Sequence, residues 1–264
     1  MNNPKISVVM TVFNTEKYLK PAIQSILNQS FKKWELIIVD DFSSDKSKEI
    51  LKNLKDKRIR IFFLKRHYGR TQALNYALKK TKGKYIAILD SDDTSSTNRL
   101  FLQEKFLNKN TNINLVATRT RLINENKKTI GLFPEFNELK KLNQVVVYKN
   151  IVPHSSVMFR KSNLKKTGIY PKNLKWAQDY GLILKFAKRG RIYLMPKTLT
   201  TSRILKTSMT YRKEYKLIKV KEEMILLLFS IKNFKLDIFQ KYNVYSRIIK
   251  NSFKYFFLLL IFKF

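Results

Sequence analysis

Aspartates are the residues of this chain best suited to chemistry, and most of them gather in three groups. The groups are Asp40-Asp41, Asp90-Ser91-Asp92-Asp93 and Asp179. The first two follow short apolar runs, 35–39 and 84–89, whose length and β-branched content predict buried strands. Because ligands of open α/β sheets bind at the carboxyl ends of the strands, we expect both groups to converge on one crevice. Like charges held this close need a counter-ion, and a divalent cation that bridges substrate phosphates would supply it.

Each group also has a structural explanation. Aspartate after a strand often caps the next helix, and residues 41–45, before a helix predicted at 46–54, have that pattern. Asp179 likewise precedes an amphipathic segment. Two acidic groups at two strand ends, the second with three carboxylates in four residues, together favour a functional site over helix capping.

The composition limits the kinds of site that are available. The chain has 264 residues, no cysteine and two histidines. Disulfides, thiolate zinc sites, a cysteine nucleophile and a multi-histidine metal site are therefore excluded. This length allows one substantial core with a small appendage. No secretory signal precedes the first predicted strand, and no apolar run reaches the roughly 18 residues needed to span a bilayer, so we expect the folded part to face the cytoplasm.

A strong positive charge, with 54 Lys and Arg against 19 Asp and Glu, calls for an anionic partner. Nucleic acid is the weaker alternative, because the lysines are dispersed rather than gathered in one arm. An anionic membrane surface is the other, because residues 204–264 carry 13 Lys and Arg against 4 Asp and Glu and end in a short apolar stretch, 255–262. Such a tail is typical of an interfacial membrane helix, although a helix that packs back onto the core would look the same.

Strands and helices alternate in the first half of the chain. The predicted strands are 6–12, 34–39, 59–64, 85–89 and 114–117, and the predicted helices are 16–29, 46–54, 71–81 and 99–108. This order predicts the α/β class, with a mostly parallel central sheet flanked by helices on both faces. The second half is less regular, with strands at 128–133 and 157–159 and a helix at 177–188, and from Tyr211 onward the pattern predicts long helices. No glycine-rich dinucleotide loop or Walker-type loop follows the first strand.

Four motifs give the chain a resemblance to a known family. They are VVMTVFN at 8–14, VDDFSSD at 39–45, ILDSDD at 88–93 and QDY at 178–180. In this order and spacing they resemble the signatures of family 2 glycosyltransferases, which have the GT-A fold. The resemblance covers residues 4–205 and implies a GT-A domain at 1–205, with a nucleotide-sugar-binding half at 1–118 and an acceptor half at 119–205. A basic amphipathic helical tail, 206–264, would follow as a C-terminal helical extension.

The resemblance assigns the donor nucleotide to the ends of the first two strands. Thr11, Phe13 and Asn14 would hold the base, with Phe13 stacked on it. Asp41 would accept a hydrogen bond from the base, and Asp40 would support that loop. Because a carboxylate can accept from the N3 proton of uracil, a UDP-sugar is the favoured donor.

The resemblance assigns the diphosphate and the metal to the second acidic group. Gly69 and Arg70 match a turn and helix near the donor, where Arg70 is either a diphosphate contact or a solvated surface arginine. The segment that starts at Asp90 resembles the DXD motif of the family. Asp90 would then reach the ribose, Asp92 would coordinate Mn²⁺ or Mg²⁺, and Asp93 would extend the metal site. The cation would offset the charge that develops on the leaving diphosphate.

The resemblance assigns the acceptor to the second half of the chain. Asp179 matches the general base of the family, which takes the proton of an acceptor hydroxyl that is otherwise a poor nucleophile. His154 falls in a stretch on the acceptor side and is either functional or structural, and Trp176 either stacks on a sugar ring or belongs to the core. One departure from the family pattern is Phe42, which stands where many members have glycine.

The resemblance thus implies an inverting, metal-dependent glycosyltransferase that adds a single sugar, from a nucleotide-diphosphate donor, to a saccharide or lipid-linked acceptor. It would work in cell-surface polysaccharide synthesis, as a peripheral protein on the cytoplasmic face of the membrane. Two other functions stay open. A nucleotidyltransferase on a similar sheet would also use paired carboxylates and a metal, but it should carry a glycine-rich basic loop after the first strand. A non-catalytic membrane or nucleic-acid binder would explain the charge and leave the clustered aspartates unexplained.

Overall fold

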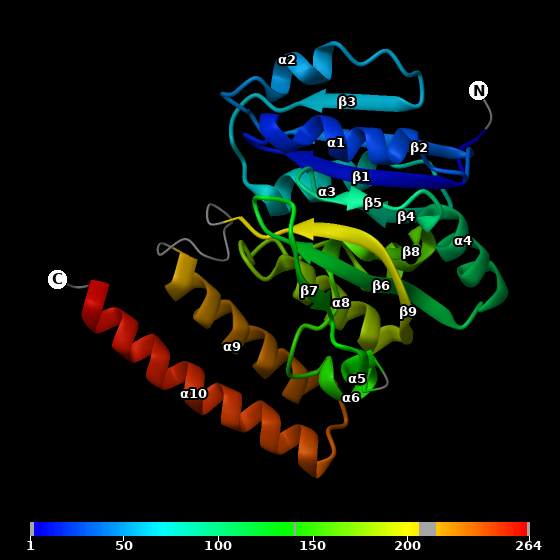
Figure 1. The fold of residues 1–264 in the computed structure, drawn as a ribbon. Coiled ribbons are helices and arrows are strands. Elements are labelled where there is room, and N and C mark those ends of the chain that lie inside the picture. The colour runs from blue at the N-terminus through cyan, green and yellow to red at the C-terminus, as the bar shows by residue number, and fades with distance from the viewer. Residues whose placement is uncertain (1–2, 140, 206–214, 263–264) are drawn as a thin grey trace.

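A single mixed sheet of nine strands forms the centre of the molecule (Figure 1). The computed structural model describes residues 3–139, 141–205 and 215–262. The strands are β1 (Ile6–Val12), β2 (Trp34–Asp40), β3 (Ile59–Phe63), β4 (Tyr85–Ile88), β5 (Thr94–Ser95), β6 (Ile113–Ile123), β7 (Thr129–Phe133), β8 (Met158–Arg160) and β9 (Arg191–Arg203). Their order in the sheet is β3-β2-β1-β4-β8-β6-β9-β5, and β7 pairs with β6.

Ten α-helices lie within the described residues. They are α1 (Glu16–Leu27), α2 (Ser47–Lys52), α3 (Arg70–Lys80), α4 (Arg99–Lys109), α5 (Phe136–Leu139), α6 (Leu142–Val145), α7 (Leu164–Thr167), α8 (Gln178–Arg189), α9 (Lys216–Asn233) and α10 (Ile238–Phe262). Two short 3₁₀ turns, His154–Ser156 and Lys161–Asn163, flank β8.

The first half of the chain folds as its pattern predicts. Strands β3, β2, β1 and β4 are adjacent and parallel. Because successive side chains of a strand point to opposite faces, Val8 and Met10 pack with α1 and α4, whereas Val9 packs with α3 and α8. The helices therefore cover both faces, and the carboxyl ends of β1, β2 and β4 open along one edge.

The second half extends this sheet with strands of both directions. β8 is antiparallel to both β4 and β6, and β6 is parallel to β9. β9 was not predicted from the sequence. Its pairing with β6 shifts between Met195 and Thr198, so that a bulge takes up Pro196 and Lys197. This long strand carries the chain back to the edge where β4 ends.

The C-terminal helices α9 and α10 form an antiparallel pair, with α9 next to α8 and α10 as the outer layer (Figure 1). Val220, Leu226 and Leu227 of α9 are buried, and Leu226 belongs to the core beneath α8. Residues 206–214, where the predicted tail begins, lie outside the described residues. None of the described helices is long and apolar enough to cross a bilayer.

Candidate active site

Hydrogen bonds join the two loops that follow β1 and β2. The Asn14 N–H donates to Ser43 Oγ (3.1 Å), and Asn14 Oδ1 accepts from the N–H of Ser44 (2.8 Å). Asn14 and Phe42 both have left-handed backbones, with φ of 52° and 68°. Asparagine tolerates this conformation, but a bulky phenylalanine is strained in it. A glycine at the position of Phe42 would adopt this conformation without strain.

Asp41 connects the end of β2 to the turn before α3. Its two carboxylate oxygens accept the N–H groups of Tyr68 and Gly69, each at 2.8 Å, and Oδ2 lies 2.9 Å from His67 Nδ1. Gly69 has a φ of 90° and directly precedes α3. Burial raises the pKa of Asp41, although the two N–H bonds and His67 act in the opposite direction. His67 stacks on Phe13 with ring centroids 3.9 Å apart, so these residues form one cluster.

Thr11 and Asp40 belong to the strands themselves. Thr11 lies opposite Val39 in the parallel pairing of β1 with β2. Asp40 is buried, and its Oδ2 accepts the Ser43 N–H (3.2 Å), whereas its Oδ1 has no hydrogen-bond partner among the described residues. The structure therefore places Asp40 at the end of β2, with a hydrogen bond to the loop that follows it.

Asp90 is the centre of a second cluster, at the end of β4. Its Oδ2 accepts from Arg70 (2.6 Å), and Arg70 also donates to His154 Nδ1 (2.9 Å), 3.3 Å from Asp90 Oδ1. The other ring nitrogen, Nε2, faces the Tyr170 hydroxyl at 2.8 Å. Burial opposes ionisation of Asp90, but Arg70 and His154 hold its pKa well below the usual range. Burial alone would lower the pKa of Arg70; Asp90, Asp179 and Asp92 instead raise it. Arg70 is thus half-buried and paired with Asp90 rather than free in solvent.

Asp92 and Asp93 have different surroundings. Asp93 is buried, and its oxygens accept from Ser202 Oγ (2.7 Å) and the Arg203 N–H (3.0 Å) of β9. Burial, with Asp92 and Asp90 close by, raises the pKa of Asp93 well above its usual value. Burial and Asp90 raise the pKa of Asp92 to about 6. Asp92 makes no side-chain hydrogen bond to another residue in the described part of the chain, so its carboxylate is free to take a ligand.

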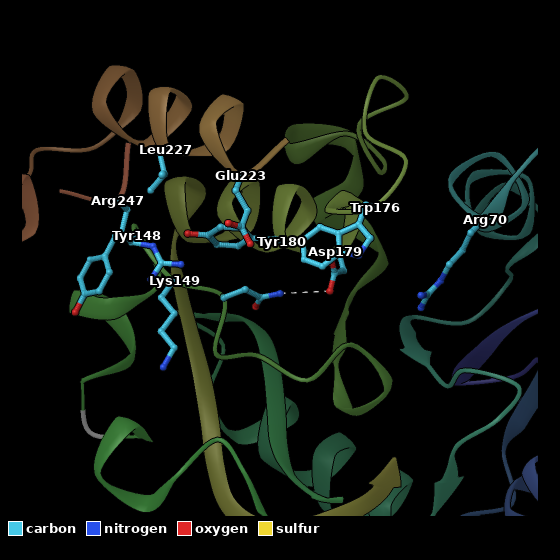
Figure 2. Close-up of a pocket in the computed structure, with 10 residues that line it drawn as sticks. Arg70, Tyr148, Lys149, Trp176, Asp179, Tyr180, Glu223, Leu227 and Arg247 are labelled. Carbon is cyan, nitrogen blue, oxygen red and sulfur yellow. Dashed lines mark hydrogen bonds between the residues drawn. The ribbon is translucent and has the colours of Figure 1, made fainter. Parts of the chain in front are cut away.

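Asp179 lies in the first turn of α8, beside a cavity of about 350 Å³. Its Oδ2 accepts from Asn150 Nδ2 (3.3 Å), the dashed line in Figure 2. Trp176 lines the same cavity next to Asp179, and Lys219 Nζ lies 4.6 Å from the centre of its ring. Arg70 lines this cavity too, which connects Asp179 to the Asp90 cluster.

A glutamate of α9 holds the start of α8. Glu222 is 4% exposed and accepts the backbone N–H groups of Lys175 (2.7 Å), Trp176 (2.9 Å) and Ala177 (2.8 Å). A carboxylate at a helix N-terminus satisfies N–H groups that have no partner in the helix and is favoured by the helix dipole. The turn that carries Asp179 is therefore fixed by the C-terminal helices.

The carboxylates at the end of β4 suit a divalent cation that is shared with a substrate. Among the described residues, no three acidic or histidine side chains form a complete metal site. Mg²⁺ in phosphate sites takes only one or two carboxylates and completes its shell with phosphate oxygens and water. Asp92, crowded by Asp90 and without a protein partner in the described residues, is the carboxylate that meets this requirement.

The structure groups the predicted site residues into two connected clusters. Asp41, Gly69 and Phe13 lie together beside the ends of β1 and β2, and Arg70 connects Asp90 to Asp179. His154 lies against Asp90 and Arg70, and its assignment to the acceptor side stays a prediction. Sequence reasoning missed Asn150, Tyr170, Glu222 and Arg99, a buried arginine that donates to the carbonyls of Ile88 (2.9 Å) and Val157 (3.1 Å). The only signal for Glu222 was an acidic residue in a basic tail.

The order of the strands and the acidic edge of the sheet define an α/β protein with the GT-A fold. A model of the family described as "Glycosyl transferase family 2" matches residues 7–168. The chain belongs to this family, which favours the glycosyltransferase hypothesis over the two alternatives.

Two relatives show how far the similarity extends. The chain is 38% identical over 185 residues to an uncharacterized glycosyltransferase of Methanocaldococcus jannaschii, covering 68% of this chain and 63% of that protein. It is 37% identical over 188 residues to the O-antigen biosynthesis glycosyltransferase WbnJ of Escherichia coli, covering 68% and 70%. The chain thus spans less than two thirds of the length of the first of these.

Solved structures share the fold at low sequence identity. S. aureus TarS (residues 1–349) in complex with UDP has a TM-score of 0.70 and 21% identity, covering 95% of this chain and 72% of that one. The mannosyltransferase PcManGT of Pyrobaculum calidifontis, in complex with GDP-Man and Mn²⁺, has a TM-score of 0.72 and 17% identity, covering 98% and 74%. Both likenesses establish the fold.

Proposed function

We propose that this protein is an inverting glycosyltransferase that moves one sugar from a nucleotide-diphosphate sugar, with a UDP-sugar favoured, to a saccharide or lipid-linked acceptor in cell-surface glycan synthesis. One observation carries the proposal: Arg70 lies within reach of the charges of Asp90, Asp92 and Asp179 and lines the cavity beside Asp179. A group that could contact the donor diphosphate therefore lies next to a group that could activate the acceptor. The name of WbnJ and the nucleotides bound by TarS and PcManGT support the same class of substrates.

The donor would lie along the carboxyl ends of β1, β2 and β4. Phe13 would stack on the base, in the place where it now stacks on His67. Beyond the two N–H groups and His67, the carboxylate of Asp41 keeps one lone pair, so it can hold the turn and also accept from the base. Asp90, paired with Arg70, would orient the ribose.

Asp92 would hold a divalent cation, Mn²⁺ or Mg²⁺, whose chemistry is to neutralise charge on the leaving diphosphate. The Mn²⁺ bound to PcManGT supports this assignment. Asp93 is already occupied by hydrogen bonds from β9, so we propose that it mainly positions the loop that carries Asp92.

Asp179 would act as the general base. Its carboxylate, held by Asn150, takes the proton of an acceptor hydroxyl as the hydroxyl oxygen attacks the anomeric carbon of the donor sugar. The new bond forms on the face opposite the diphosphate. The bond from the anomeric carbon to the diphosphate oxygen breaks, the nucleoside diphosphate leaves, and the anomeric configuration inverts.

The donor site is tested by calorimetric titration of the protein with UDP and with GDP, each with and without Mn²⁺. We expect one nucleotide to bind in a metal-dependent manner, and Asp92→Asn to remove the effect of the metal. Asp179→Asn, in contrast, should keep the nucleotide affinity and lower the rate of sugar transfer by roughly 10² to 10⁴. If neither nucleotide binds, or if Asp179→Asn transfers sugar at the normal rate, the proposed function is wrong.

We also propose that α10 binds an anionic membrane surface. Ten large apolar or aromatic residues of this helix are 47% to 87% exposed: Ile238, Phe239, Tyr242, Tyr245, Ile249, Phe253, Phe256, Phe257, Leu260 and Ile261. They recur at three- and four-residue spacing, and residues 238–262 contain lysine and arginine but no acidic residue. An apolar stripe flanked only by cations suits an interfacial helix on anionic lipid. The cytoplasmic location stays a prediction.

Vesicle flotation tests the membrane contact. The protein should float with vesicles that contain phosphatidylglycerol and not with pure phosphatidylcholine vesicles. Phe253→Ser on α10 should reduce the bound fraction, whereas Phe101→Ser, which alters an exposed phenylalanine on α4, should not. Equal effects of the two substitutions would contradict a specific role of α10.

A further inference from the structure

The cavity beside Asp179 is closed on one side by the C-terminal helices (Figure 2). It is lined by residues of five parts of the chain: Arg70, Tyr148, Lys149, Asn150, Trp176, Asp179, Tyr180, Glu223, Leu227 and Arg247. Its volume of about 350 Å³ is in the range of small-molecule sites. Asp179 and Trp176 lie toward one end, near Arg70, and Arg247 and Tyr148 lie at the other end.

The cations of this cavity differ in how they are paired. Arg70 is paired with Asp90 at 2.6 Å, and Lys149 is paired with Glu138 at 2.6 Å. Arg247 makes no ion pair and no hydrogen bond with any residue of the described ranges. Arg247 is half-buried on α10. Burial raises the pKa values of Tyr148 and Tyr180, and the positive charge of Arg247 lies close enough to both to oppose this rise. An uncommitted guanidinium in a concave site is suited to a carboxylate or a phosphate, which it can bind through two parallel hydrogen bonds.

The other lining groups fit a sugar. Tyr148, Trp176 and Tyr180 supply aromatic surfaces, and Asn150 with Asp179 supplies hydrogen-bonding groups at the end where the reaction would occur. Glu223 is the second acid of the cavity and accepts a long hydrogen bond from Asn251 (3.4 Å). Because Glu223 would repel an anion, the acidic group of a ligand belongs on the side of Arg247 that faces Tyr148 and Lys149 (Figure 2).

We infer that this cavity binds an acceptor glycan that carries an acidic group, with Arg247 as the residue that recognises the acid. The inference rests on the proposed role of Asp179 and names the substrate class of that site. The accepting hydroxyl lies at Asp179, and the carboxylate or phosphate lies at the opposite end. Helix α10 therefore completes the acceptor site.

Ligand-observed NMR titrations test this inference, with the whole chain saturated with UDP and Mn²⁺. The probes are methyl β-glucuronide, glucose 1-phosphate and, as the neutral match, methyl β-glucoside. We expect at least one charged probe to bind about tenfold more tightly than the neutral one. A tenfold difference in affinity is about what one additional charge-assisted hydrogen bond contributes. The charged probe that binds better distinguishes a carboxylate from a phosphate.

Two variants of α10 make the test specific, because each removes one positive charge from the same helix. Arg247→Gln should abolish the preference for the charged probe, and Lys254→Gln, at an exposed position outside the cavity, should retain it. The inference is overturned if charged and neutral probes bind equally, if neither binds, or if Arg247→Gln keeps the preference. The UDP affinity of the same samples distinguishes a wrong function from a wrong acceptor class. If the unaltered protein does not bind UDP, the proposed function is refuted. If it binds UDP but shows no preference for the charged probes, only this inference is refuted.

Discussion

Replacement of Glu222 by glutamine tests whether the C-terminal helices hold the catalytic end of α8 in place. The carboxylate of Glu222 is buried and is shared by three backbone N–H groups within 2.9 Å. Glutamine has the same shape but no charge, and only one of its two terminal atoms accepts hydrogen bonds. At least one of the three N–H groups would therefore face an amide NH₂ group in a place without water.

The expected loss follows from these contacts. A buried donor without a partner costs about 1–3 kcal/mol. The missing charge at the N-terminus of α8 adds about 0.3–1 kcal/mol. The free energy of unfolding should therefore fall by about 1–4 kcal/mol, which is a substantial part of the stability of a typical domain.

The assay compares two neighbouring glutamates by urea unfolding at 25 °C. Glu223→Gln is the matched control, because Glu223 lies on the same helix and, within the described part of the chain, accepts only the long bond from Asn251. Its effect should stay within about 0.5 kcal/mol. In donor hydrolysis, where water replaces the acceptor, Glu222→Gln should lower the rate about ten- to a hundredfold by misplacing Asp179. The affinity for UDP should not change. If Glu222→Gln unfolds like Glu223→Gln and hydrolyses the donor at the normal rate, α9 does not position α8.

Two further predictions concern the nucleotide loops. Phe42→Gly should raise the free energy of unfolding, measured in urea melts, by about 0.5–1 kcal/mol. The exposed phenylalanine now has a φ of 68°, and glycine adopts this conformation at lower cost. An unchanged or lower stability would show that the Phe42 ring contributes more than its strained backbone costs. Phe13→Ala should weaken UDP binding roughly fivefold or more in calorimetry, since a base–aromatic stack contributes about 1–3 kcal/mol. Phe101→Ala is its control, because Phe101 is 44% exposed and Phe13 43%, and equal affinities of the two variants would exclude the stack.

The sequence predicted those parts of the fold that local pattern determines. An apolar run that ends in aspartate placed β2 and β4, and their parallel pairing with β1 brought the two acidic groups to one edge. The long strand that the prediction missed, β9, contains Pro196 and a polar end, and its regularity comes from its pairing with β6 and β5. A strand that is regular because of its pairing with a neighbouring strand cannot be predicted from its own residues alone.

The site residues that sequence reasoning missed share a different cause. Glu222 and Arg247 lie on the C-terminal helices, about 40 to 70 positions after Asp179, and nothing in their local sequence indicates which surface those helices cover. Amphipathic periodicity predicts a helix with an apolar face, but it does not say whether that face meets lipid or protein. In the structure the two helices differ. Val220, Leu226 and Leu227 of α9 are buried in the protein, whereas α10 leaves its apolar stripe exposed.

This division gives the C-terminal pair two roles that support each other. Helix α9 fixes the start of α8 through Glu222, and α10 both contributes Arg247 to the cavity and presents its aromatic stripe outward. In Figure 1, α10 forms one side of the molecule, and α2 with β3 forms the opposite side. With α10 on a membrane, the acceptor cavity would therefore lie next to the lipid surface, and β3 at the outer edge of the nucleotide half would lie far from it. A lipid-linked acceptor could then reach Asp179 without leaving the bilayer, while the soluble donor arrives from the other side.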